Sequence, residues 1–155
     1  MRALVLVLAL VFAPAAHGSG AIISGPAEAV DGDTIRIDGR SIRIEGVDAF
    51  ERSQACGAVA CGREAAAFTA RFVAGAIVRC AQTDTDRYGR TVARCSVGGA
   101  DLGGALVQAG WALAYVKYSR AYVDDEAVAR GQRAGAWADA VTPPWEWRAE
   151  RRGTS

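Results

Sequence analysis

Two short acidic clusters contain the residue types best suited to chemistry in this sequence. They are Asp31-Gly32-Asp33-Thr34 and Asp48-Ala49-Phe50-Glu51. If neighbouring strand ends bring Asp33 and Asp48 together, the two carboxylates repel each other unless a cation lies between them. Hard cations such as Ca²⁺ or Mg²⁺ prefer oxygen ligands of this kind. Residues 31–33 alone also fit an ordinary Asx-turn, in which aspartate and glycine only shape a loop.

Two arginines near these clusters could bind phosphate. Arg43 belongs to the polar face of an expected strand, five residues before Asp48, and Arg90 ends the polar loop of residues 84–90. A guanidinium group binds phosphate oxygens in a fork and remains charged. Two such groups facing a metal would stabilise the charge on a pentacoordinate phosphorus. The alternative interpretation is solvated surface charge.

A third group combines aromatic and basic side chains. Its members are Tyr88 in the polar loop and, later in the chain, Tyr115, Lys117, Tyr118, Arg120 and Tyr122. Aromatic faces stack on bases while neighbouring cations hold phosphates, so this combination suits nucleic acid. Burial in the core explains the later tyrosines equally well, above all Tyr122 at the head of an expected helix.

The N-terminal residues have the layout of a secretory signal peptide. Met1-Arg2 is positively charged, residues 3–12 are apolar, and residues 14–20 are small and turn-prone. We therefore expect a signal peptide over residues 1–20, with cleavage between residues 16 and 20. The apolar run is shorter than the ~20 residues that span a bilayer. The alternatives are a short buried helix and an uncleaved anchor.

Export would leave a mature chain with unusual limits on its chemistry. His17 is the only histidine and would leave with the signal peptide. A Ser-His-Asp triad, a Cys-His pair and a histidine metal site are then excluded, and proton transfer falls to carboxylates. Removal of Arg2 leaves 17 basic against 17 acidic residues. Affinity for a polyanion must therefore come from a local cluster of charge.

The cysteines indicate covalent stabilisation in an oxidising compartment. Four of them lie in the exported part, at positions 56, 61, 80 and 95. We expect the disulfides Cys56–Cys61, which closes a small loop, and Cys80–Cys95, which joins two expected hairpin strands. Two other pairings are possible. A zinc site is disfavoured because the sequence has no CxxC spacing and no histidine to complete it.

Hydrophobic periodicity predicts the elements that position these residues. Alternating patterns predict two strands, residues 34–38 and 41–45, joined by a turn at Gly39-Arg40. An earlier strand is expected within residues 21–30, broken at Gly25-Pro26. Two further strands, residues 76–81 and 91–97, flank a polar loop of residues 82–90. Helices are expected over residues 62–75, 101–108 and 120–134, and the tail after Pro143-Pro144 is expected to be loosely held. Five short strands with helices suit a closed barrel of the OB type, although other α+β folds remain possible.

The order of these motifs resembles the staphylococcal nuclease (thermonuclease) family. The likeness rests on residues 30–35, 42–51 and 86–93, and then on residues 106–112, 114–116 and 135–137, in the family's order from about Ala27 to Trp137. The resemblance implies an α+β fold, an OB-type five-stranded β-barrel with three helices, here over residues 21–140 with a tail of residues 141–155. It also implies Ca²⁺-dependent, endonuclease-type hydrolysis of DNA and RNA that leaves 3′-phosphate ends.

The resemblance also implies a role for each matched residue. Asp33 and Asp48 match the metal carboxylates, and Ala49 matches a position that binds metal through its main-chain carbonyl. Glu51 matches the proposed general base, and Arg43 and Arg90 match the phosphate-binding arginines. The nucleotide-binding positions are matched by Arg87, Tyr88, Tyr115 and Tyr118. We expect a secreted or periplasmic monomer with no stable membrane association.

The sequence departs from the family pattern in three ways. Phe50 replaces the proline usual between the second metal carboxylate and the general base, so this loop gains an N–H and loses a fixed φ. The chain is nearly neutral where familiar members are basic, and it has four cysteines. Two other functions fit less well: a barrel of this kind that binds without catalysis, and an exported structural or inhibitory domain whose charges are only surface.

Overall fold

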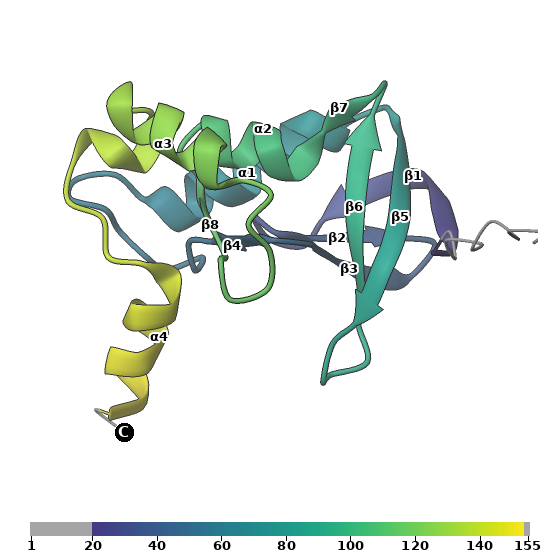
Figure 1. Cartoon of the computed structure of the whole chain (residues 1–155), viewed down its shortest axis with the longest axis horizontal. Coiled ribbons are helices and arrows are strands. Elements are labelled where there is room, and N and C mark those ends of the chain that lie inside the picture. Colours follow the sequence, from purple (N-terminus) through teal and green to yellow (C-terminus); the bar gives the residue numbers. More distant parts are fainter. Residues whose placement is uncertain (1–19, 154–155) are drawn as a thin grey trace, which may run out of the picture.

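The computed structural model describes residues 20–153, so the expected signal peptide, Gly20 apart, lies outside the described residues (Figure 1). The strands are β1 (Ile22–Ala29), β2 (Thr34–Ile37), β3 (Arg40–Ile44), β4 (Val47–Ala49), β5 (Ile77–Thr85), β6 (Thr91–Val97), β7 (Ala100–Asp101) and β8 (Ala112–Ala114). The helices are α1 (Cys61–Val73), α2 (Leu102–Gln108), α3 (Val123–Gly131), a 3₁₀ turn η1 (Gly135–Ala138) and α4 (Pro144–Gly153).

Five of the strands close into a barrel, which confirms the expected OB-type α+β fold. The strand order is β3-β2-β1-β5-β6, and a parallel pairing of β3 with β6 closes the ring. The expected β2–β3 hairpin is present, with Ile35 opposite Ile42 and its isoleucines buried in the core, but its turn is Asp38-Gly39 rather than the expected Gly39-Arg40. The expected break at Gly25-Pro26 is wrong. There β1 continues and changes partner, from β5 up to Pro26 to β2 from Ala27.

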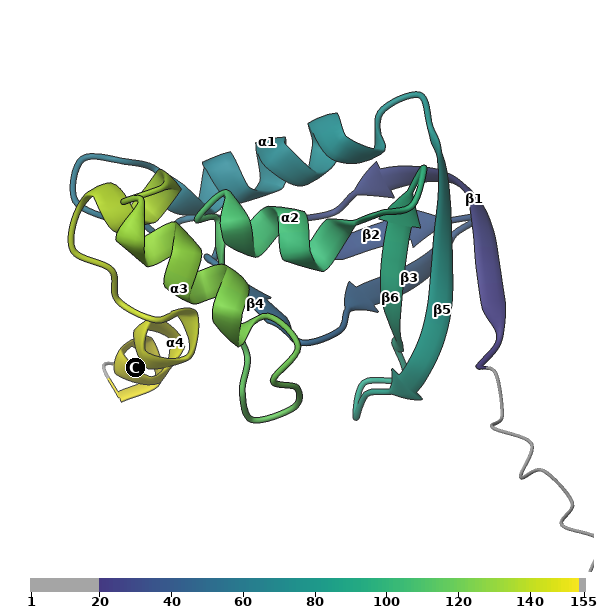
Figure 2. The same cartoon turned by 45° about the horizontal axis from the view of Figure 1, so that its top comes forward.

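The helices α1, α2 and α3 gather on one side of the barrel, as Figures 1 and 2 both show. Leu102, Leu106 and Val107 of α2 join the barrel core. Beside the barrel, β4 pairs with β8 in a separate two-stranded sheet. The bounds of two expected elements were wrong. Strand β5 runs on to Thr85 and shortens the polar loop, and α3 is shorter at both ends than residues 120–134.

The expectation of a loosely held tail is also wrong, because α4 is a formed helix. It starts at Pro144, and proline is favoured in the first turn, where its missing N–H has no intrahelical partner in any case. The Pro-Pro pair therefore begins a helix here rather than ending one. Its Trp145 and Arg148 contact residues of the main domain, which holds the helix in place. In Figure 1 this helix projects below β4 and β8.

Both expected disulfides are present. Cys56 is joined to Cys61, and Cys80 is joined to Cys95 across directly paired positions of β5 and β6. Such bonds form and persist in oxidising compartments, with which the expected export is consistent. Within residues 20–153, no helix has both the length and the apolar character needed to cross a membrane.

The disulfide between β5 and β6 should contribute most of the covalent stabilisation. The double variant Cys80→Ala/Cys95→Ala should lose about 3 kcal/mol of unfolding free energy, since the bond closes a loop of sequence separation 15. Urea unfolding measures this loss. The control Cys56→Ala/Cys61→Ala opens a loop of separation 5 and should lose only about 2 kcal/mol. An equal or smaller loss in the β5–β6 variant would contradict the loop-closure argument.

Candidate functional site

The loop between β1 and β2 is shaped to present Asp33 inward. The carboxylate of Asp31 accepts a hydrogen bond from the N–H of Asp33 at 3.1 Å, so the expected Asx-turn is present. A side chain at Gly32 would lie 2.6 Å from the Cβ of Ala49, which requires glycine at this close approach. The buried hydroxyl of Thr69 in α1 donates to the Gly32 carbonyl at 2.6 Å. Helix α1 thus fixes the loop from behind.

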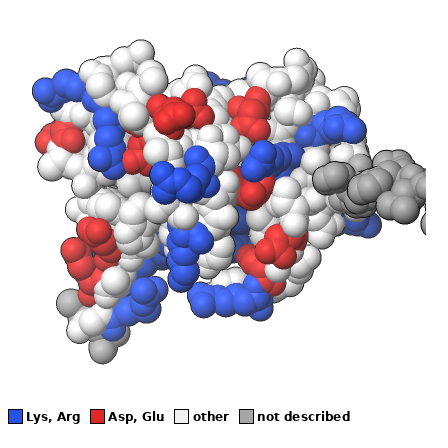
Figure 3. All heavy atoms as spheres, in the orientation of Figure 1, with Lys and Arg blue, Asp and Glu red and all other residues white. Residues whose placement is uncertain are grey.

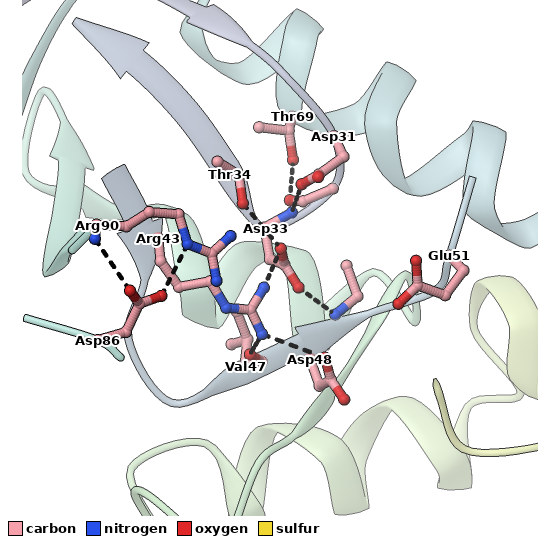
Figure 4. A network of polar contacts seen from close by, with 12 residues as sticks. Asp31, Asp33, Thr34, Arg43, Val47, Asp48, Glu51, Thr69, Asp86 and Arg90 are labelled. Carbon is pink, nitrogen blue, oxygen red and sulfur yellow. Dashed lines mark hydrogen bonds and ion pairs between the residues drawn. The ribbon is translucent and has the colours of Figure 1, made fainter. Parts of the chain in front are cut away.

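Arg43 joins the two expected metal carboxylates. It lies opposite Thr34 in the β2–β3 hairpin, which places its guanidinium beside Asp33. One terminal nitrogen pairs with Asp33, and the other donates to Asp48 at 3.1 Å and to the Val47 carbonyl at 3.0 Å. Figure 4 shows these side chains converging from two strands and a loop. The structure therefore brings Asp33, Asp48 and Arg43 together.

Burial makes the charge of these carboxylates costly. Burial raises the pKa of Asp31 to about 6, and the nearby Asp33 carboxylate adds to the rise. Burial also raises the pKa of Asp48, although hydrogen bonds from Arg148 partly offset it. For Asp33, burial acts in the same direction, but the charge and hydrogen bonds of Arg43 outweigh it and lower the pKa. The cluster therefore holds negative charge that only neighbouring cations can stabilise.

The Asp48–Glu51 segment is held by the backbone and by one buried glutamine. The N–H of Ala49 donates to Asp33 at 2.8 Å, which ties β4 to the β1–β2 loop. A side chain at Gly62 would meet the Glu51 carbonyl at 1.7 Å, so α1 begins in direct contact with this segment. Gln54 accepts from the Glu51 N–H at 3.1 Å and donates to the Thr142 carbonyl at 2.8 Å.

A residue absent from the expected site, Arg148 of α4, contacts both Asp48 and Glu51. One guanidinium nitrogen lies 2.7 Å from the outer oxygen of Asp48. The other lies 2.7 Å from Glu51 and 3.2 Å from the oxygen of Asp48 that Arg43 also contacts. Glu51 thus joins the acidic cluster through Arg148. Sequence reasoning missed this residue because the tail was interpreted as loose.

Arg90 belongs to a neighbouring polar cluster in the loop between β5 and β6. Its side chain pairs with Asp86 at 2.7 Å, and its backbone N–H donates to the same carboxylate at 3.0 Å. In Figure 4 its guanidinium points toward that of Arg43. Arg87 donates to the hydroxyl of the exposed Tyr88 at 2.6 Å, and both Arg87 and Arg90 lie over its ring.

The later tyrosines divide into two environments. Tyr115 and Tyr118 follow β8 and contact each other edge to face, with ring centroids 4.9 Å apart. Tyr115 also stacks on Trp145 of α4, nearly parallel at 5.5 Å. Tyr122 is a core residue, the alternative left open above, and its hydroxyl donates to Asp101 at 2.9 Å.

The oxygen donors fit a hard cation, although they form no complete cage. Among residues 20–153, no three acidic, cysteine or histidine side chains gather as a metal cluster. Asp33 and Asp48 nevertheless share one guanidinium group, and both are buried. Two carboxylates that are buried close together repel each other, so a cation between them is favoured. A carbonyl, water and substrate oxygens would have to supply the other ligands.

Comparison with known families settles the relationship. The family model described as staphylococcal nuclease homologue matches residues 41–139. The chain belongs to the staphylococcal nuclease family. The matched region includes Arg43, Asp48, Glu51 and Arg90, whereas Asp33 precedes it and α4 follows it. The closed five-stranded barrel agrees with membership in this family.

One curated relative is the Protein ParB of Escherichia coli. It is 36% identical over 83 residues, an alignment that covers 44% of this chain and 47% of ParB. The chain thus spans about half the length of this curated relative. Charged side chains of both signs are interspersed on the face in Figure 3, so this nuclease-family chain has local rather than general positive charge there.

The sequence contained weak signals for the residues that were missed. Trp145 and Arg148 are three positions apart and so share one face of a helix that begins at Pro144. Thr69 and Gln54 carry no such signal, since their buried contacts depend on how α1 and the 139–143 segment pack.

The buried hydroxyl of Thr69 gives a direct test of how the site loop is held. Thr69→Val keeps the shape but leaves the Gly32 carbonyl without this donor, so unfolding free energy should fall by about 1–3 kcal/mol. Chemical denaturation measures the loss. Thr83→Val is the matched control, because its exposed hydroxyl also donates to a carbonyl and its loss should be within about 0.5 kcal/mol. Equal effects of the two substitutions would refute the buttressing role.

Proposed function

We propose that the protein is an exported Ca²⁺-dependent nuclease that hydrolyses phosphodiester bonds of DNA and RNA and leaves 3′-phosphate ends. The observation that carries the proposal is the shared contact of Arg43 with Asp33 and Asp48. This contact supports the proposal because two carboxylates and one guanidinium group meet at a single buried point, in a chain of the staphylococcal nuclease family. Endonucleolytic action by a monomer belongs to the same proposal.

The metal-binding part consists of the carboxylates of Asp33 and Asp48 and the main-chain carbonyl of Ala49. Asp33 and Asp48 supply the negative charge that a hard cation prefers, and burial reduces competition from water. A bound divalent cation would polarise the phosphate and stabilise its developing charge. Every other step falls to side chains of this protein.

The catalytic part consists of Glu51, Arg43 and Arg90. Glu51 accepts a proton from the water that attacks phosphorus in line with the 5′ oxygen. The P–O5′ bond breaks, and the leaving oxygen takes up a proton from solvent to become a 5′-hydroxyl. Arg43 and Arg90 donate to the equatorial oxygens as negative charge builds on them. In this scheme Arg43 exchanges part of its contact with the carboxylates for a contact with phosphate, and Arg90 does the same with Asp86.

The substrate-binding part consists of the aromatic and basic groups around the cluster. Arg87 and the exposed Tyr88 form one pair, and the half-buried Tyr115 forms another with the exposed Tyr118. Rings of this kind stack on unpaired bases whatever their sequence. We therefore assign single strands of either nucleic acid as substrates.

The first test is cleavage of single-stranded DNA, RNA and plasmid DNA with Ca²⁺, Mg²⁺ or a chelator. We expect cleavage with Ca²⁺ that the chelator abolishes, and products with 3′-phosphate ends that a 3′-phosphatase converts. Cleavage that persists in chelator would refute metal dependence. A complete lack of cleavage under all conditions would refute the nuclease.

The second test separates the catalytic side chains from surface charge. At saturating Ca²⁺, Arg43→Gln and Glu51→Gln should each lower the cleavage rate at least about a hundredfold, the typical loss when one donor to a transition state is removed. The controls Arg36→Gln in β2 and Glu64→Gln in α1 change exposed residues and should cleave at the wild-type rate. Thermal melts with Ca²⁺ verify that each variant is folded. Wild-type rates in both site variants would exclude the scheme.

A further inference from the structure

Helix α4 lies beyond the family match at residues 41–139, yet two of its side chains reach into the proposed nuclease site. Arg148 contacts Asp48 and Glu51, which are assigned above to the cation and to the proton transfer. Trp145, one turn earlier, lies on Tyr115, which is assigned to the nucleotide. One short helix thus contacts all three parts of the proposed chemistry.

Arg148 occupies the oxygens that a cation would use. Both oxygens of Asp48 accept from its guanidinium, at 2.7 and 3.2 Å, and Arg43 shares the second one. The side chain of Asp48 is only 2% exposed, so solvent cannot take the place of these partners. A divalent ion on Asp48 would lie within a few ångströms of a fixed positive charge. The two cations therefore compete for the same carboxylate.

Trp145 occupies a face of Tyr115 that could otherwise hold a base. The two rings lie almost parallel, with an angle of 4° between their planes. This is the stacked geometry that a nucleobase adopts on an aromatic side chain. A base that stacks on this face of Tyr115 must therefore displace the indole.

Most residues of α4 are not buried. Pro144 is its only fully buried residue, and Trp145 is partly buried against the apolar cluster that includes Phe50. A cavity of about 240 Å³ lies beside Trp145, bordered by Ala114 of β8 and Arg130 of α3. The contacts of α4 that bear on the proposed site are thus the stacked ring of Trp145 and the guanidinium group of Arg148.

We propose that α4 is a built-in cover of the nuclease site, in which Arg148 takes the place of the divalent cation and Trp145 takes the place of a nucleobase. Calcium and a single strand displace these two side chains when they bind. The inference rests on the proposed function, because Arg148 and Trp145 compete only if a cation binds Asp48 and a nucleobase stacks on Tyr115.

The cation part is tested by calcium titration of the full chain. Arg148→Gln should bind Ca²⁺ at least about tenfold more tightly than the wild type in isothermal titration calorimetry, because a competing positive charge is removed. Ca²⁺ should also raise its melting temperature more than that of the wild type, since the Asp48 oxygen that Arg43 does not contact has lost its guanidinium partner unless the ion binds. Arg152→Gln removes an exposed charge from the same helix and should match the wild type in both measurements.

The base part is tested with a ten-residue oligothymidine in chelator. Trp145→Leu should bind this strand several-fold more tightly than the wild type, as measured by fluorescence anisotropy. Trp147→Leu, on the same helix but without a ring contact to Tyr115, should not. Unchanged or weaker affinity in Trp145→Leu would overturn the role of the indole as a competitor.

The outcomes separate this inference from the proposed function. If the wild type cleaves with Ca²⁺ but Arg148→Gln binds the ion equally or less tightly, Arg148 supports the site and the cover is refuted. If neither protein binds Ca²⁺ and the wild type does not cleave, the proposed function fails and the cover fails with it.

Discussion

The whole site depends on one buried guanidinium group that serves two carboxylates. Arg43 pairs with Asp33 and Asp48, which come from a loop and from β4, and all three side chains are largely shielded from water. An ion pair in such a place adds little net stability, but removing one partner costs about 3–5 kcal/mol because the other charge is left alone. The cluster must therefore form as a unit. This requirement explains why the hairpin register, the Gly32 contact and the Thr69 hydrogen bond all converge on it.

The charge balance of the cluster explains what it can bind. The carboxylates of Asp33, Asp48 and Glu51 contact the two guanidinium groups of Arg43 and Arg148, and a fourth carboxylate, that of Asp31, accepts from the Asp33 N–H. Above about pH 6, where Asp31 loses its proton, the excess of two negative charges equals the charge of one divalent cation. Below that pH a proton on Asp31 relieves part of the excess. The site thus favours a cation without any histidine or thiolate ligand.

Sequence reasoning predicted the elements that are determined by residues close together in the chain. The β2–β3 hairpin follows from alternating isoleucines, and both disulfides follow from loop size and strand pairing. The resemblance of the motifs to a known family supplied the barrel and the pairing of Asp33 with Asp48, which periodicity alone left open. What could not be predicted depends on contacts across the fold. The partner exchange of β1 at Pro26, the buttress of Thr69 and the docking of α4 all require packing that no local pattern records.

At Phe50, which replaces the usual proline, contacts between distant residues hold the backbone that a proline would otherwise restrict. Proline would fix φ before Glu51, whereas Phe50 is buried and anchors the segment through its side chain. Gln54 then accepts from the Glu51 N–H and donates to the Thr142 carbonyl. That link leads to a residue after 139. In this chain, the geometry of the proposed general base therefore depends on a C-terminal segment outside the matched family region.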